Sequence, residues 1–199
     1  KFNKIEKSNP KMLFDMANYF KNLKKYKRAV KYYSQIILTL DQNSKIKSEL
    51  LYRRGSSYER LKNFKKSDED LLRAMAAKPN DAYVLNYLGY SWLERNYKID
   101  KAMMMLKKAY SIKNNDPYII DSIGWGYYLI DDYLEAEKYL KRAVELMPND
   151  PIVNDHYGDI LWKLNRKLQA RYFWNNVLGF DDTDDDTKKK INIKLVKGL

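Results

Sequence analysis

Cysteine is absent from this 199-residue chain, so disulfide bonds and thiolate zinc sites are excluded. Only five prolines and seven glycines occur, which disfavours a turn-rich β fold. The single histidine, His156, excludes histidine-rich metal sites and disfavours a serine–histidine–aspartate triad. No apolar run approaches the roughly 18 residues of a membrane-spanning helix. The sequence is nevertheless 45% hydrophobic, which is enough to form a buried core.

Positive charge is concentrated in the first part of the chain. Residues 1–81 carry 20 Lys/Arg and 9 Asp/Glu, whereas residues 82–199 carry 18 and 17. A basic segment can attract an acidic partner or a nucleic-acid backbone. Most of the cations are lysines, however, and aromatic neighbours such as Tyr26 fall at packing positions of the repeat described next. We therefore interpret the charge mainly as a compositional bias and keep nucleic-acid binding as a second hypothesis.

Small residues recur along the chain with a fixed period. Four glycines are separated by 34, 35 and 34 residues, namely Gly55, Gly89, Gly124 and Gly158. Ala17 lies 38 residues before Gly55 and occupies the same position in an earlier period. A second small residue recurs in the later half of each period: Ala29, Ser67, Ala102, Ala136 and Ala170. Two antiparallel helices approach closely only where one side chain is small, and large residues fill the space around it. The pattern predicts stacked helix pairs.

This pattern resembles the tetratricopeptide repeat, a helix–turn–helix unit of 34 residues. The resemblance implies an all-α fold, an α-solenoid of antiparallel helix pairs in a superhelix with a C-terminal capping helix. Within residues 10–180 we place five units, at 10–43, 48–81, 82–116, 117–150 and 151–180. Residues 1–9 are interpreted as the end of a preceding helix and residues 44–47 as an insertion. Residues 181–199 are interpreted as an acidic turn and the capping helix, whose charges suit the helix dipole.

Two longer strings carry a narrower resemblance. Ile-Asp-Ser-Ile-Gly-Trp-Gly-Tyr-Tyr at 120–128 and Asn-Asp-His-Tyr-Gly-Asp-Ile-Leu-Trp at 154–162 resemble the C-terminal part of exported tetratricopeptide proteins of alphaproteobacteria. The resemblance implies a bacterial protein, a longer parent chain with a signal peptide and a periplasmic location, with the cytoplasm as the alternative. The start at Lys1 agrees with a fragment. The sequence carries no signal for a particular oligomeric state.

The family resemblance further implies that the first helix of each unit lines a concave face through positions 2, 5, 9 and 12, which form one helical stripe. In units three to five this stripe is rich in aromatic and carboxylate side chains. We predict a partner-binding surface at Tyr83, Asn86, Tyr90, Tyr118, Asp121, Trp125, Tyr128, Asp155, Asp159 and Trp162. Contiguous exposed aromatics usually mark a binding site, and the carboxylates favour a partner carrying lysine or arginine. The alternative is that the rings pack on one another in a tight superhelix.

Few residues are candidates for chemistry. Asp155, His156 and Asp159 are close enough in sequence for a metal or acid–base site, but a metal would need further ligands. We interpret them as polar contacts within or between units. The acidic run at 181–186 lacks the glycine and glutamate of a calcium loop, and the dispersed glycines do not form a phosphate loop. We therefore predict no catalytic residue, metal site, cofactor or enzymatic activity.

The sequence thus predicts a protein-interaction scaffold that binds a peptide or helix of another protein in the groove of units three to five. Two other hypotheses stay open. The chain could be a nucleic-acid-binding repeat protein that uses its basic first half, or a regulatory domain of a larger enzyme.

Overall fold

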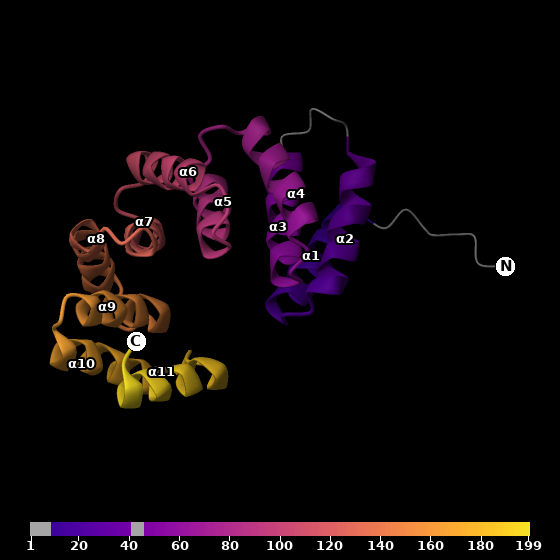
Figure 1. Ribbon diagram of the computed structural model, residues 1–199. Coiled ribbons are helices and arrows are strands. Elements are labelled where there is room, and N and C mark those ends of the chain that lie inside the picture. The colour runs from indigo at the N-terminus through magenta and orange to yellow at the C-terminus, as the bar shows by residue number, and fades with distance from the viewer. Residues whose placement is uncertain (1–8, 41–45) are drawn as a thin grey trace. The chain divides into compact units, whose positions relative to one another are not determined.

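The computed structural model describes residues 9–40 and 46–199, and eleven α-helices lie in these two ranges (Figure 1). In chain order they are α1 (Pro10–Asn22), α2 (Tyr26–Thr39), α3 (Lys47–Arg60), α4 (Phe64–Ala77), α5 (Ala82–Glu94), α6 (Ile99–Ile112), α7 (Pro117–Leu129), α8 (Tyr133–Leu146), α9 (Pro151–Lys163), α10 (Lys167–Leu178) and α11 (Asp185–Lys197). These ranges contain no strand. The predicted all-α solenoid of helix pairs is therefore confirmed. Residues 1–8 of the preceding helix predicted at 1–9, and residues 44–45 of the insertion predicted at 44–47, lie outside the described residues.

Aspartates begin four of the odd-numbered helices at regular intervals. Asp81, Asp116, Asp150 and Asp184 are spaced by 35, 34 and 34 residues, and each accepts hydrogen bonds from the first-turn amides of α5, α7, α9 or α11. A side-chain oxygen at this position satisfies backbone donors that have no partner within the helix. The constant spacing shows that α11 begins where the first helix of another pair would begin.

Tight turns join the two helices of each pair. Each turn contains a residue with a left-handed backbone conformation, and none of these residues is glycine: Lys24, Lys62, Asn96, Asp131 and Asn165. The turn between α5 and α6 has a second one, Lys98, and the unit placed at 82–116 is one residue longer than a 34-residue repeat. Asparagine and aspartate tolerate this conformation better than lysine does.

Three of the four repeated glycines, Gly55, Gly124 and Gly158, lie at helix–helix contacts, as the sequence predicts. A Cβ on Gly55 would lie 2.9 Å from Leu71 Cγ, and one on Gly124 would lie 2.8 Å from Leu140 Cγ. A Cβ on Gly158 would lie 2.4 Å from the Trp174 ring. All three distances are shorter than van der Waals contact, so the second helix of each pair packs directly on the backbone of the first.

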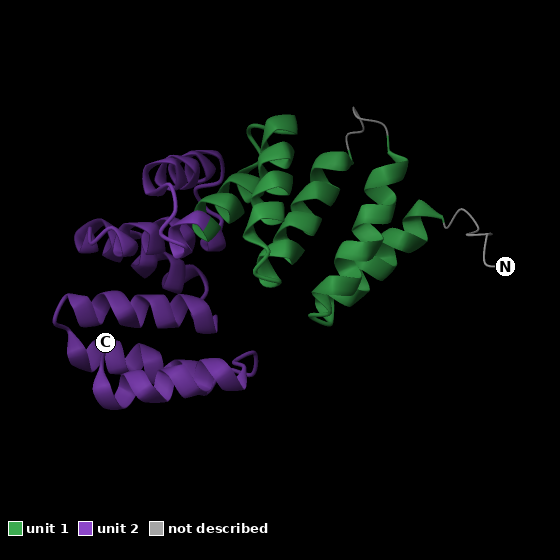
Figure 2. Cartoon of the chain, turned by 45° about the vertical axis from the view of Figure 1, so that its right-hand side comes forward, with its two compact units in different colours: residues 1–91 green, residues 92–199 purple. Residues whose placement is uncertain are grey.

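Residues 1–91 and 92–199 form two compact units (Figure 2). The core of the first unit contains the fully buried side chains Ala17, Tyr33 and Leu50. The core of the second unit is larger and includes Ile120, Leu140, Ile160 and Trp174. Among the described residues, no helix is both long and apolar enough to cross a membrane.

Candidate partner-binding surface

The predicted binding residues are divided between the two units. Three of them lie on α5 in the first unit: Tyr83, Asn86 and Tyr90. The other seven lie on α7 and α9, two parallel first helices that contact each other in the second unit. The seven residues on α7 and α9 therefore belong to one compact unit.

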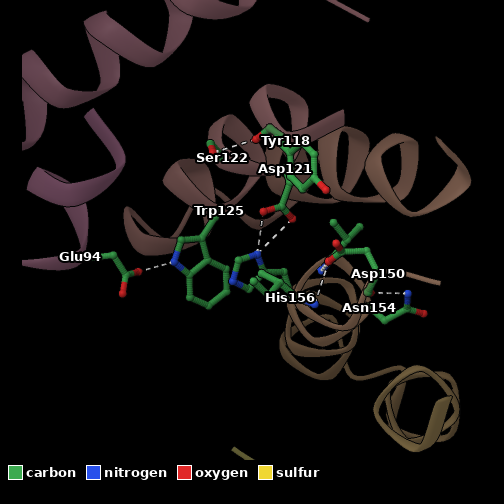
Figure 3. Close-up of polar contacts among 10 residues, drawn as sticks. Glu94, Tyr118, Asp121, Ser122, Trp125, Asp150, Asn154 and His156 are labelled. Atoms are coloured by element: carbon green, nitrogen blue, oxygen red, sulfur yellow. Dashed lines mark hydrogen bonds and ion pairs between the residues drawn. The ribbon is translucent and has the colours of Figure 1, made fainter. Parts of the chain in front are cut away.

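Trp125 of α7 stacks on two other rings, and Figure 3 shows it between Glu94 and His156. Its ring lies 4.0 Å from the His156 ring at an interplanar angle of 12° and 4.4 Å from the Tyr128 ring at 9°. Its indole nitrogen donates a 2.6 Å hydrogen bond to Glu94 Oε1. The predicted alternative, in which the groove rings pack on one another, is thus realised for Trp125 and Tyr128. Both rings are half-buried, so part of their surface remains accessible.

His156 joins α9 to α7 through Asp121. Its Nδ1 lies 3.0 Å from both carboxylate oxygens of Asp121, and both side chains are buried. Burial lowers the pKa of His156, but the charge and hydrogen bond of Asp121, helped by the nearby Asp155 and Asp159, raise it overall above its ordinary value. This contact agrees with our interpretation of His156 as a polar residue that packs between neighbouring repeats.

The other two predicted carboxylates are bound by α11. Lys194 Nζ donates hydrogen bonds to Asp155 Oδ1 at 2.5 Å and to both oxygens of Asp159 at 2.7 and 2.8 Å. Asp159 also accepts a 2.9 Å hydrogen bond from the Trp174 indole. We expected free carboxylates that would attract a basic partner. In this structure Asp121, Asp155 and Asp159 already have partners within the chain.

Trp162 is covered by the end of α11 as well. A Cβ on Gly198 would lie 2.0 Å from the Trp162 ring, so the backbone at the end of α11 rests directly on the indole. Lys167 and Arg171 of α10 lie over the same ring, at 5.2 and 4.9 Å from its centroid. Trp162 is therefore a packing residue with limited exposure.

The most exposed apolar side chains of this surface lie at position 2 of their helices. Tyr118 is 57% exposed and Ile152 is 58% exposed. They occupy the same register position on α7 and α9, next to the capping residues Asp116 and Asp150. Burial of part of the phenol and then the charges of Asp150, Asp116 and Asp182 raise the pKa of Tyr118, which indicates a negative potential around its hydroxyl.

A common rule explains how these helices are connected. In α3, α5 and α9, the residue at position 6 reaches back to the first helix of the preceding pair. Arg53 donates to Asn18 at 3.2 Å, the Tyr87 hydroxyl donates to Glu59 at 3.0 Å, and His156 donates to Asp121. Groove-facing polar groups are therefore partly used to hold neighbouring repeats together.

Sequence reasoning missed Glu94 and Lys194 as partners of this surface. The sequence signal for Lys194 was the regular spacing of the capping aspartates, because it places α11 beside α9 as the next first helix. Glu94 carried no such signal, since it lies outside the stripe of positions 2, 5, 9 and 12. Among the described residues, no group of three or more His, Cys, Asp or Glu side chains is placed to hold a metal ion.

Comparison with known proteins agrees with this architecture. A family model described as tetratricopeptide repeat matches residues 10–38 and 48–81. A TPR repeat-containing protein of Pseudomonas aeruginosa is 32% identical over 110 residues, which is 55% of this chain and 18% of that protein. The chain thus corresponds to a small part of the length of that relative.

Solved structures show the same fold at low sequence identity. A thermophilic TPR protein of Thermus thermophilus superposes with a TM-score of 0.80 and 18% identity, covering 94% of this chain and all of that one. The pilF protein of Pseudomonas aeruginosa superposes with a TM-score of 0.73 and 17% identity, and the match covers 94% of this chain and 83% of that one. MamA of Desulfovibrio magneticus superposes with a TM-score of 0.68 and 16% identity, and the match covers 90% of this chain and 98% of that one. Stacked repeats of this kind present extended surfaces suited to protein binding, and this chain contains tetratricopeptide repeats.

Proposed function

We propose that the protein is an interaction scaffold that binds an extended or helical segment of another protein on the surface formed by α7 and α9. The observation that carries this proposal is the exposure of Tyr118 and Ile152 at the same register of two parallel, contacting helices. Neither side chain is needed for the core, and large exposed apolar residues in such an arrangement are typical of binding surfaces.

The half-buried stack of Trp125 and Tyr128 extends this apolar surface along α7. Because Trp125 is fixed by His156 and Glu94, its ring is already oriented before a partner arrives. A ring held in one orientation loses little conformational entropy on binding. We call the surface formed by Tyr118, Trp125, Tyr128 and Ile152 the α7–α9 strip.

The chemistry of the partner follows from the surroundings of the strip. Asp116 and Asp150 lie at the helix ends beside Tyr118 and Ile152, and Glu94 lies beside Trp125. These three residues accept hydrogen bonds from uncharged donors, namely backbone amides and the Trp125 indole, whereas Asp121, Asp155 and Asp159 pair with His156 or Lys194. The support for a basic partner therefore comes from the charge of Asp116, Asp150 and Glu94. We infer a segment with one or two large apolar side chains and a neighbouring lysine or arginine.

The proposal is tested with peptides selected against the wild-type protein from a random displayed library. Tyr118→Ala combined with Ile152→Ser should weaken binding of the selected peptides at least tenfold, as measured by fluorescence anisotropy. The matched control is Leu168→Ser on α10, which removes an apolar side chain that is 85% exposed and lies outside the strip. Unchanged affinity of the selected peptides for the double variant would refute the α7–α9 strip.

Trp125→Ala is a poorer test, because this ring packs on His156 and its loss perturbs the contact between α7 and α9. Circular dichroism should show that the variants used for binding keep the wild-type helix content. The periplasmic location implied by the narrower resemblance also stays a proposal, and fractionation of cells that express the full natural gene would test it.

A further inference from the structure

The last helix is attached to the rest of the second unit by few buried side chains. Ile191 is the only buried residue of α11, whereas eight residues of α9 are buried. The other anchors are the partly buried Leu195, which packs against the core and whose backbone carbonyl accepts from Arg171, together with Lys194 and the contact of Gly198 with Trp162. An element with so few buried apolar contacts opens at a lower free energy than the core does.

Lys194 occupies a site that is built for an ammonium group. Its Nζ contacts Asp155 and Asp159, and it lies 5.8 Å from the centroid of the Trp174 ring. The Trp174 ring is fully buried and is held by the hydrogen bond from its indole to Asp159. Two carboxylates and the face of an indole are the groups that recognise a lysine ammonium most effectively.

Removing Lys194 would leave two carboxylates one helical turn apart on α9. Asp159 is almost fully buried, and its pKa is already raised by burial and by the charge of Asp155 despite the presence of Lys194. Like charges at this spacing repel each other, and a buried charge without a partner is strongly unfavourable. The site formed by Asp155, Asp159 and Trp174, which we call the lysine site, therefore favours a cation in the place of Lys194 when α11 opens.

We propose that α11 acts as an internal ligand of the lysine site and that a lysine-bearing helix of a partner protein can replace it. The geometry of Lys194 defines the chemistry of that partner as a helix with one lysine facing α9 and an apolar residue at the position of Ile191. This inference rests on the proposed function for the existence of a protein partner, but it concerns a different surface from the α7–α9 strip.

The test uses a fluorescent peptide of residues 185–199 added to the complete chain. In the Lys194→Glu variant the internal helix is released by charge repulsion, and the peptide should bind at least tenfold more tightly than to the wild type. A peptide that carries Lys194→Met should not bind, and added salt should weaken binding of the natural peptide. The matched control is the Lys190→Glu chain, which has the same charge reversal at an exposed position of α11 and should behave like the wild type.

Hydrogen exchange determines whether the released helix is α11 alone. We expect rapid exchange of α11 amides and unchanged protection of α9 and α10 in the Lys194→Glu chain. Protected α11 amides, or equal peptide binding by all chains, would overturn the proposal. The Lys194→Met chain keeps the apolar stem of the side chain and serves as a milder second variant. If both variants lose protection in α9 and α10, Lys194 is a residue of the fold and the exchange model is also wrong.

The two proposals fail independently. Tyr118→Ala with Ile152→Ser should leave binding of the 185–199 peptide to the Lys194→Glu chain unchanged. A peptide that binds there while library peptides ignore the α7–α9 strip would support the lysine site and refute the strip. The opposite result would support the strip and refute the lysine site.

Discussion

His156 shows how one side chain connects two repeats. It reaches from α9 to Asp121 of α7 and stacks on Trp125, so a single imidazole joins a buried ion pair to an aromatic surface. The protonated ring makes this pair stronger, since both partners then carry charge. The stability of the second unit should therefore depend on the protonation of His156.

The first prediction concerns this titration. The pKa of His156 is raised in the folded protein, so its contribution to stability is fully present below about pH 6.5, the unfolded value, and is lost as pH rises through the higher folded value. Since the chain has one histidine, its NMR signal can be followed without ambiguity. We expect a titration midpoint above 6.5 and a fall in the free energy of unfolding as the pH rises from the unfolded value through that midpoint.

His156→Gln is the control for this prediction. Glutamine can still donate a hydrogen bond to Asp121 but does not titrate in this range, so the fall in stability with pH should largely disappear. A histidine midpoint at or below 6.5 in the wild type would show that burial outweighs Asp121.

Gly158, at position 8 of α9, has a packing role that can be measured. Gly158→Ala would place a methyl group 2.4 Å from the rigid Trp174 ring, and we expect a loss of about 1–3 kcal/mol in the free energy of unfolding. The loss should exceed the gain of about 1 kcal/mol that alanine brings to a helix. Gly179→Ala is the matched control, because a Cβ there meets its nearest atom at an ordinary 3.5 Å. Equal stabilities of the two variants in urea denaturation would contradict the packing role.

At the scale of the helical elements, two turns between paired helices hold a residue type that disfavours their left-handed backbone conformation. The left-handed positions in the two turns of the first unit hold Lys24 and Lys62, whereas asparagine or aspartate occupies the corresponding positions later in the chain. Lysine in this conformation places Cβ close to a carbonyl oxygen, and asparagine compensates by local hydrogen bonding.

Lys62→Asn should therefore raise the free energy of unfolding by about 0.5–1 kcal/mol, because asparagine fits the left-handed conformation at this turn. The comparison variant is Lys65→Asn in α4, an exposed lysine with helical backbone, which should lower stability by about 0.5 kcal/mol because asparagine is the poorer helix former. Thermal denaturation of the two variants separates the predictions by sign. A decrease for both would indicate that Lys62 makes a contribution that its backbone conformation does not explain.

The uneven charge is a property of the whole molecule. Residues 1–81 hold most of the net charge of +12, and this excess is the basis of the nucleic-acid hypothesis. In the described part of this segment several cations are engaged locally. Arg54 makes a two-pronged ion pair with buried Asp70, and Arg53 pairs with Glu49. These residues contribute to helix packing, which supports the compositional interpretation.

We therefore expect only weak binding to nucleic acid. Affinity for mixed-sequence RNA or DNA should stay weaker than about 1 µM at about 150 mM salt, as is normal for non-specific electrostatic attraction. Filter binding across a salt series measures both the affinity and its salt dependence. Sub-micromolar, strongly salt-dependent binding at that ionic strength would make the basic first half the leading functional surface.

The sequence by itself determined the repeat, the all-α solenoid and the helices that carry each candidate residue. These features are local or periodic, because small residues, capping aspartates and apolar stripes act at fixed distances along the chain. The sequence also indicated that His156 packs between units, since one histidine without further ligands has few other uses.

The partners of the groove residues were decided by the tertiary structure alone. Asp155 and Asp159 read as free carboxylates along the chain, yet Lys194, 35 residues beyond Asp159, neutralises both of them. Trp125 reads as an exposed anchor, yet His156 and Glu94 from other helices fix it in a stack. Side-chain pairing across helices depends on the distance between elements, which a periodic pattern does not encode. The stripe predicts which residues face the groove, and only the folded chain determines which of them remain available to a partner.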